Sequence, residues 1–135
     1  MHKTDLADLS ATELLRLYRS KQVSPVEATQ AALQRIDALN PSLNAYCLVD
    51  HERALQSARE SEARWQQGAP VGALDGVPTS IKDLILTRGW PTLRGSKTID
   101  PSQPWDVDAP ATARLREAGA VLLGKTCTPE FGCKG

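Results

Sequence analysis

The sequence has no excess of charge of either sign: among its 135 residues, Lys and Arg together number 16, and Asp and Glu also number 16. General binders of nucleic acid or of acidic membranes carry a basic excess or a basic patch, so this balance argues against both classes. No apolar run approaches the length of a membrane span. The start of the chain leads into polar residues rather than into the core of a signal peptide. We therefore expect a soluble, cytoplasmic domain.

Cysteine and histidine are scarce as well. Cys47, Cys127 and Cys133 form an odd set without a secretory signal, which argues against a disulfide framework. Cys127 and Cys133 are too far apart for a closely spaced metal-binding pair, and only His2 and His51 could assist. We expect reduced thiols that are small and partly buried, and neither a metal nor a cofactor.

Two capping boxes mark the starts of two N-terminal helices. In residues 10–13 (Ser-Ala-Thr-Glu) and 24–27 (Ser-Pro-Val-Glu), the serine can accept from the third helical amide while the glutamate reaches back. Apolar side chains at helical spacing predict a first helix over about residues 11–21. Proline suits the first position of the second helix. We expect this helix to end at Asn40-Pro41, because proline interrupts helical hydrogen bonding.

Helices and short apolar segments alternate along the rest of the chain. Residues 44–49 are predicted to form a buried strand, and Asp50 then caps a third helix that ends at Gly68. A fourth helix is predicted over about residues 109–118. The wholly apolar residues 120–123 are typical of a strand covered on both faces. This alternation predicts the α/β class, a sheet flanked by helices.

One lysine stands in an unusual place. Lys82 lies in the short apolar segment 75–83 (Asp-Gly-Val-Pro-Thr-Ser-Ile-Lys-Asp), and a loop rich in turn residues follows at 89–96. A lysine in a strand either extends its ammonium to water, which is the ordinary case, or is held in a polar interior site. An interior site would favour the neutral amine and make it usable as a base.

The sequence around Lys82 resembles the amidase signature family of serine hydrolases. The resemblance extends over about residues 5–135 and is strongest after Gly72. Short words in the same order carry it: Leu74-Asp75-Gly76-Val77-Pro78, Ile81-Lys82-Asp83, Gly89-Trp90-Pro91-Thr92, Gly95-Ser96, Asp108-Ala109-Pro110, Leu115-Arg116-Glu117-Ala118-Gly119-Ala120-Val121, Gly124-Lys125-Thr126 and Pro129-Glu130-Phe131-Gly132.

The resemblance implies a mechanism and a larger protein. In the family, the lysine of the Ile-Lys-Asp word belongs to a Ser–cis-Ser–Lys triad, which makes Lys82 the candidate catalytic residue. The nucleophilic serine, the bridging serine and the oxyanion hole belong to a glycine-flanked serine segment downstream of the lysine, and this sequence has no such segment. The chain therefore resembles the front piece of an amidase that hydrolyses a carboxamide to an acid and ammonia or an amine. By itself, it is expected to be inactive.

The resemblance also implies how the chain is organised. We expect a helical leader over about residues 1–70 and the start of the catalytic core over about residues 71–135, with N-terminal helices beside part of a large mixed sheet. Because the remaining strands are absent, a sheet edge should be exposed and the chain should tend to self-associate. The expected ligand is a small-molecule amide, with no nucleic-acid or membrane partner, no cofactor and no metal.

Other polar residues in these words have simpler explanations. Ser80 shares a face with Lys82 in a regular strand, and Ser96 follows in the loop, but neither stands in a glycine-flanked segment. Hydrogen bonding within a turn is the simpler role for both. Asp83 points away from Lys82 in an ideal strand and is expected to be structural rather than its charge partner. Two further charged residues are expected to fix a loop or a helix end by hydrogen bonds: Arg94 and Glu130.

Residues 119–126 formally match the phosphate-loop pattern Gly-x-x-x-x-Gly-Lys-Thr. A true phosphate loop follows a strand and precedes a helix, whereas residues 120–123 are themselves a predicted strand and Pro129 follows soon after. Gly119 is better explained as a helix stop. Nucleotide binding is therefore not expected.

Two other functions stay open. One is the amidase-like subunit of a glutamine-dependent tRNA amidotransferase, which shares the fold and the lysine. Its members tend to end the Glu-Phe word with Ala-Met-Gly, whereas this chain has Gly132-Cys133-Lys134, so this function ranks lower. The other is a non-catalytic interaction module that has kept the front half of the fold.

Overall fold

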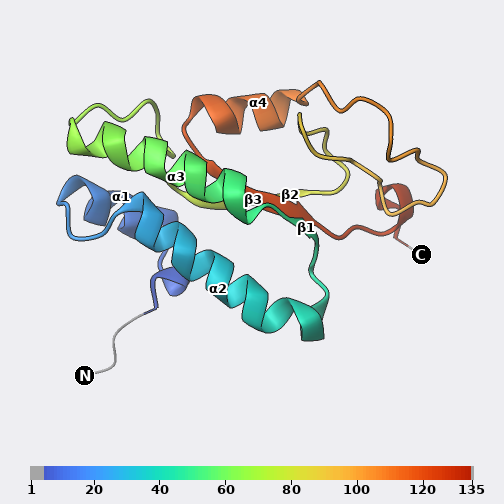
Figure 1. Ribbon diagram of the computed structural model, residues 1–135, viewed down its shortest axis with the longest axis horizontal. Helices are drawn as coiled ribbons and strands as arrows, with labels where there is room; N and C mark the ends of the chain where they lie inside the picture. Colours follow the sequence, from blue (N-terminus) through green and yellow to red (C-terminus); the bar gives the residue numbers. More distant parts are fainter. Residues whose placement is uncertain (1–4, 135) are drawn as a thin grey trace.

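A computed structural model describes residues 5–134 of the chain. Its helices flank a small central sheet, as Figure 1 shows. In chain order the elements are η1 (Leu6–Asp8), α1 (Ala11–Arg19), α2 (Pro25–Leu43), β1 (Tyr46–Val49), α3 (His51–Gln66), β2 (Pro78–Lys82), α4 (Pro110–Glu117), β3 (Val121–Thr126) and η2 (Glu130–Gly132).

The sheet is mixed and has the strand order β1-β3-β2. Strand β2 runs parallel to β3, with Lys82 opposite Thr126, and β1 runs antiparallel to β3, with Val49 opposite Gly124. The α/β prediction is confirmed. Within the described residues, β1 and β2 each have one neighbour, so both outer edges of the sheet are unpaired.

The helix starts follow the local sequence. Both capping boxes form: the Ser10 and Ser24 hydroxyls accept from the amides of Glu13 and Glu27. In return, the Ser10 and Ser24 amides donate to the glutamate carboxylates. The predicted end of the second helix is wrong, because α2 continues through Pro41 to Leu43. Proline removes only one helical donor. The last turn is then closed by the Asn44 amide, which donates to the Asn40 carbonyl at 2.7 Å from a left-handed conformation.

The strands differ from their predictions in burial and length. Strand β1 was predicted to be buried, yet its residues are half-buried or exposed, because it lies at an edge of the sheet. Strand β3 is longer than residues 120–123 and extends through Lys125 to Thr126. Its first five residues are all buried, as expected for a central strand covered on both faces.

Helix α3 packs on both α2 and β3 and forms the centre of the core. It supplies Ala54 and Ala58, each fully buried, to a cluster with Leu33, Val121 and Leu123. A second cluster joins α1 to the end of α3 through Tyr18 and Trp65. A third lies at β2 and consists of Ile81, Trp90 and Leu122, with Leu115 of α4 packed against it. These apolar contacts hold β2 against β3 and α4.

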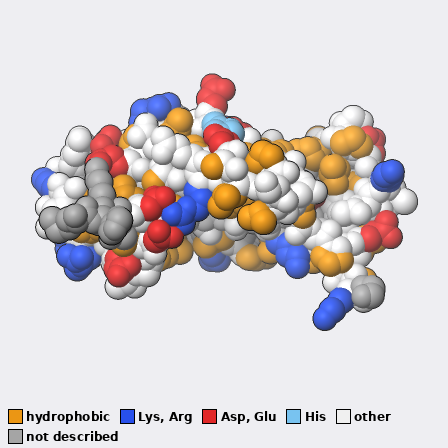
Figure 2. Space-filling view, turned by 90° about the horizontal axis from the view of Figure 1, so that it is seen from below, with side chains coloured by type: hydrophobic (Ala, Val, Ile, Leu, Met, Phe, Trp, Pro, Cys, Tyr) orange, Lys and Arg blue, Asp and Glu red, His pale blue; other side chains and the backbone are white. Residues whose placement is uncertain are grey.

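The surface carries charges of both signs. Figure 2 shows acidic and basic side chains interspersed on one face, with hydrophobic side chains between them. Arg35 of α2 pairs with two acidic residues near the start of the chain, Asp5 at 2.6 Å and Asp8 at 2.5 Å. Among the described residues, no helix combines the length and the apolar character that crossing a membrane requires.

Candidate active site

The loop that leads into β2 is fixed by a buried carboxylate. The side chain of Asp75 is fully buried. It accepts hydrogen bonds from the Ser61 hydroxyl at 2.6 Å, from Arg64 Nε and Nη2 at 2.8 and 2.7 Å, and from the Val71 amide at 2.8 Å. Trp65 Nε1 donates to the Asp75 carbonyl at 3.0 Å. Asp75 thus ties helix α3 to the entrance of the strand that carries Lys82.

The environment of Asp75 favours its charged form. Burial alone would raise the pKa of this carboxyl, but the bonds from Arg64, Ser61 and the Val71 amide outweigh burial and hold the pKa below its ordinary range. The neighbouring Gly119 has a φ of +88°, and a Cβ there would lie 2.7 Å from the Asp75 Cα. Glycine is therefore required where α4 ends against this loop.

Lys82 lies at the carboxyl end of β2, and its side chain is exposed. In sheets with parallel strands, ligands bind outside the carboxyl ends of those strands. The Asp83 amide donates to the Thr126 carbonyl at 2.8 Å, which brings the ends of β2 and β3 together beside Lys82. The location suits a reacting group. The polar interior site that a basic amine would need is not formed by residues 5–134.

Two later segments of the sequence meet at the same edge. The Arg94 amide donates to the Asp83 carbonyl at 3.0 Å, and the Phe131 amide donates to the Arg94 carbonyl at 2.7 Å. Arg94 and Phe131 both have positive φ, 56° and 52°. Such conformations are strained for bulky residues and cluster at functional sites. Gly95 lies so close that a Cβ would be 2.6 Å from the Thr128 carbonyl oxygen.

The buried lysine at this edge is Lys125, not Lys82. Its side chain is fully buried, and its ammonium donates to Thr92 Oγ1 at 2.7 Å, lies 3.1 Å from Asp83 Oδ1 and donates to the Pro91 carbonyl at 3.3 Å. Burial lowers the pKa of Lys125, while the Asp83 carboxylate opposes that shift. Asp83 is thus structural and pairs with Lys125, in agreement with the expectation that it is not the partner of Lys82.

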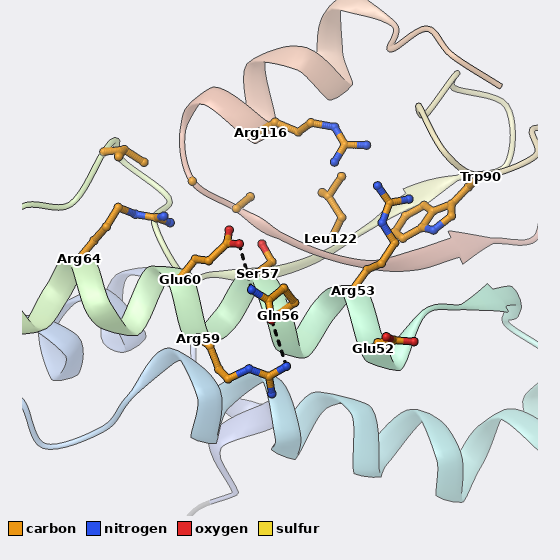
Figure 3. A pocket seen from close by; sticks show the side chains of 13 residues that line it. Glu52, Arg53, Gln56, Ser57, Arg59, Glu60, Arg64, Trp90, Arg116 and Leu122 are labelled. Atoms are coloured by element: carbon orange, nitrogen blue, oxygen red, sulfur yellow. Dashed lines mark hydrogen bonds between the residues drawn. The ribbon is translucent and has the colours of Figure 1, made fainter.

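A cavity of about 510 Å³ lies away from Lys82, between α3 and α4. Figure 3 shows Arg53 and Arg116 approaching it from opposite sides, with Trp90 beside Arg53. Three of its arginines have partners: Arg64 binds Asp75, Arg116 binds Asp108 at 2.8 Å, and the Arg53 guanidinium lies over the Trp90 ring. The fourth, Arg59, donates to Gln56 Oε1 at 3.3 Å. Lys82 is not among the residues that line this cavity.

Comparisons with known proteins agree with the position of the motif words. The family described as Amidase matches residues 27–135. The chain belongs to the amidase signature family. The A subunit of the glutamyl-tRNA(Gln) amidotransferase of Salinispora tropica is 44% identical over 128 residues, which are 95% of this chain and 26% of that protein. An acylamidase of Rhodococcus erythropolis is 41% identical over 135 residues, which are 100% of this chain and 28% of that protein.

The fold agrees with solved members of the family. A bacterial aryl acylamidase described as belonging to the amidase signature enzymes superposes with a TM-score of 0.79 at 34% identity, covering 91% of this chain and 26% of that one. The chain thus spans about a quarter of the length of these two relatives and of this solved structure. Its incomplete sheet is part of a larger amidase signature fold.

The serines near Lys82 do not form a nucleophile within residues 5–134. The Ser96 side chain lies 2.7 Å from Thr98 Oγ1 and accepts from the Thr98 amide at 3.2 Å, which is the local bonding within a turn that the sequence predicts. Ser80 lines a separate cavity of about 280 Å³, whose walls include residues of η1, α1 and α2. The register between β2 and β3 shifts between Thr79 and Ile81, where β3 has one residue more than β2. Ser80 is half-buried, whereas Lys82 is exposed.

The cysteines are more exposed than predicted. All three are free and exposed, so the expectation of partial burial is wrong, because Cys47 stands on an edge strand and the other two follow β3. Desolvation and the nearby Asp83 carboxylate raise the pKa of Cys47 to about 11. This thiol, which donates to the Lys125 carbonyl at 3.4 Å, therefore stays protonated near neutral pH and is a poor nucleophile.

Sequence reasoning missed the network around Lys125. The segment 119–126 is a helix stop followed by a strand, as predicted, and the Lys125 ammonium is buried against Asp83 instead of facing a phosphate. The signal was a lysine separated from a wholly apolar run by Gly124 alone, since a lysine in such a strand must find buried partners. Arg94 was expected to fix a loop by hydrogen bonds. It does so through its main chain, whose amide donates to Asp83 and whose carbonyl accepts from Phe131. Glu130 lies exposed in η2.

Proposed function

We propose that this chain is the lysine-bearing N-terminal part of an amidase that hydrolyses a carboxamide to a carboxylic acid and ammonia or an amine. The observation that carries the proposal is the position of Lys82 at the carboxyl end of a parallel strand pair, among the family's motif words. The leader over about residues 1–70 and the core over about residues 71–135 are part of the same proposal.

The proposed reaction uses Lys82 as the base of a Ser–cis-Ser–Lys triad. The neutral amine takes a proton through the bridging serine, so that the nucleophilic serine attacks the carbonyl carbon. The proton then goes to the leaving amine as the C–N bond breaks. Water next hydrolyses the resulting acyl-serine ester, which releases the acid and restores the serine. Residues beyond Gly135 in the complete catalytic domain would supply both serines and the oxyanion donors. They would also enclose Lys82, which is exposed in this chain alone.

The test is the release of ammonia from simple carboxamides by a protein that joins this chain to the rest of the catalytic domain. The proposal predicts turnover by that protein and none by residues 1–135 alone. If the joined protein folds but shows no turnover, the chain would instead fit a non-catalytic interaction module that has kept the front half of the fold.

A second candidate is an amidotransferase subunit, because the 44% identity to the Salinispora tropica protein is at least as high as the 41% identity to the acylamidase. The two candidates differ in what they need. An amidotransferase subunit should show glutamine-dependent amidation of glutamyl-tRNA(Gln) only together with partner subunits. An amidase should hydrolyse simple amides without partners.

A further inference from the structure

The ammonium of Lys125 has one acceptor for each of its three protons. These acceptors are the carboxylate of Asp83, the hydroxyl of Thr92 and the carbonyl of Pro91, at 3.1, 2.7 and 3.3 Å. The Asp83 side chain is 7% exposed and that of Lys125 is fully buried. The ion pair is therefore enclosed and has the extra hydrogen bonds that a buried pair needs.

All three acceptors follow Lys82 in the sequence. Asp83 follows it directly in the chain, whereas Pro91 and Thr92 belong to the loop that returns past the end of β2. Asp83 also binds this loop through its own atoms: its carboxylate accepts from the Leu93 amide at 3.3 Å, and its carbonyl accepts from the Arg94 amide at 3.0 Å. Lys125 thus lies at the centre of the contacts that join strand and loop next to Lys82.

Stability is a weak reason for such a pair. Replacing a buried ion pair by apolar residues of similar volume is often neutral or stabilising, because removing two charges from water offsets their attraction. Conformational specificity is the other use of a buried pair. A catalytic side chain must be held within about 0.5 Å of its productive place by groups around it.

We propose that Lys125 is a positioning residue: its buried ammonium, bound by Asp83 and Thr92, fixes the carboxyl end of β2 against residues 91–94 and thereby sets the place of the Lys82 amine. The inference rests on the proposed function of Lys82. It adds a second lysine to the site, one that never touches the substrate and acts through the first.

The first test is Lys125→Met in the complete amidase. We expect kcat to fall by about 10- to 100-fold, because a displacement of about 1 Å can cost a factor of about 100 in rate. KM should stay within about twofold, since Lys125 contributes no uniform substrate binding. Lys97→Met is the matched control, since Lys97 is exposed in the same long loop, and it should leave both constants unchanged.

The second test separates position from stability. The double variant Asp83→Asn with Lys125→Met removes both charges, so no unpaired carboxylate stays buried, and the urea midpoint should return close to that of the parent. We expect kcat to remain low, because the strand and the loop are no longer joined through an ammonium. Recovery of kcat together with the midpoint would overturn the proposal. If Lys125→Met alone fails to fold, the double variant still tests the positioning role. Thr92→Val tests it as well, and we expect it to lower kcat by less than the double variant does.

A third variant keeps the two proposals apart. If the Lys82→Ala enzyme keeps its full turnover, the proposed function of Lys82 is itself refuted. If the Lys82→Ala enzyme is inactive while the separate Asp83→Asn, Lys125→Met enzyme is fully active, only the positioning role is refuted.

Discussion

Asp75→Asn should destabilise the chain strongly at neutral pH. The carboxylate is fully buried and accepts from Ser61, Arg64 and Val71, with two of its bonds coming from one guanidinium. Asparagine preserves the shape, but its NH₂ group turns a donor toward groups that already donate. The substitution thus tests the hydrogen bonds and the charge rather than the packing.

The magnitude follows from the exposure of the two partners. Leaving a buried charge unpaired typically costs about 3–5 kcal/mol. The Arg64 side chain is 29% exposed, so water can partly solvate its freed charge. We therefore expect a loss of about 2–4 kcal/mol, a large part of the roughly 5–15 kcal/mol that stabilises a typical domain.

The assay is urea unfolding of the 135-residue chain. With a denaturant slope of about 2 kcal/mol per molar, the midpoint should fall by about 1–2 M. Asp106→Asn is the matched control, because Asp106 is exposed and the substitution is the same. Exposed substitutions usually stay within about 0.5 kcal/mol, so this control should move the midpoint little.

The effect should depend on pH with a defined sign. The pKa of Asp75 is lower in the folded chain than its ordinary value, so the stabilisation is fully present above about pH 4, near the pKa of the unfolded carboxyl. It is lost as the pH falls through the folded pKa. The difference in the free energy of unfolding between the parent and Asp75→Asn should therefore become smaller below about pH 4. A gap that stays constant from pH 7 to pH 3, or a midpoint equal to that of the Asp106→Asn control, would refute the reasoning.

Three further predictions concern packing and assembly. Tyr18→Phe should cost about 1 kcal/mol in urea unfolding, because the buried Gly76 carbonyl loses the hydroxyl that donates to it at 2.8 Å; an unchanged midpoint would contradict this. Gly124→Ala should cost at least about 1–3 kcal/mol, since the new Cβ would lie 2.0 Å from the Leu48 carbonyl oxygen and force β1 away from β3; unaltered stability would show that this contact relaxes easily. The unpaired edges of β1 and β2 predict self-association that grows with concentration in analytical ultracentrifugation, and a monomer at all concentrations would exclude it.

Local signals in the sequence predicted the helices well. Each capping box lies within four residues, so Ser10 with Glu13 and Ser24 with Glu27 could be found without knowing the fold. The error at Pro41 has the same origin. A proline rule applied alone ignores the Asn44 amide, which closes the last turn of α2.

Contacts between distant residues were not predictable in the same way. Strand β3 includes Lys125, whose partners Asp83 and Thr92 lie far away in the sequence. The exposed face of β1 depends on its place at the edge of the sheet, which local pattern does not encode. The resemblance to the amidase signature family located Lys82, while the second lysine required the structure.

The most direct test of the proposed chemistry is Lys82→Arg in the complete enzyme, assayed by the kcat for a simple carboxamide. Arginine keeps the positive charge and nearly the length of lysine but does not give up its proton, so it cannot act as a base. If Lys82 is the base, kcat should fall by at least about 100-fold, while Lys97→Arg leaves it unchanged. A Lys82→Arg enzyme with near-normal kcat would contradict the account.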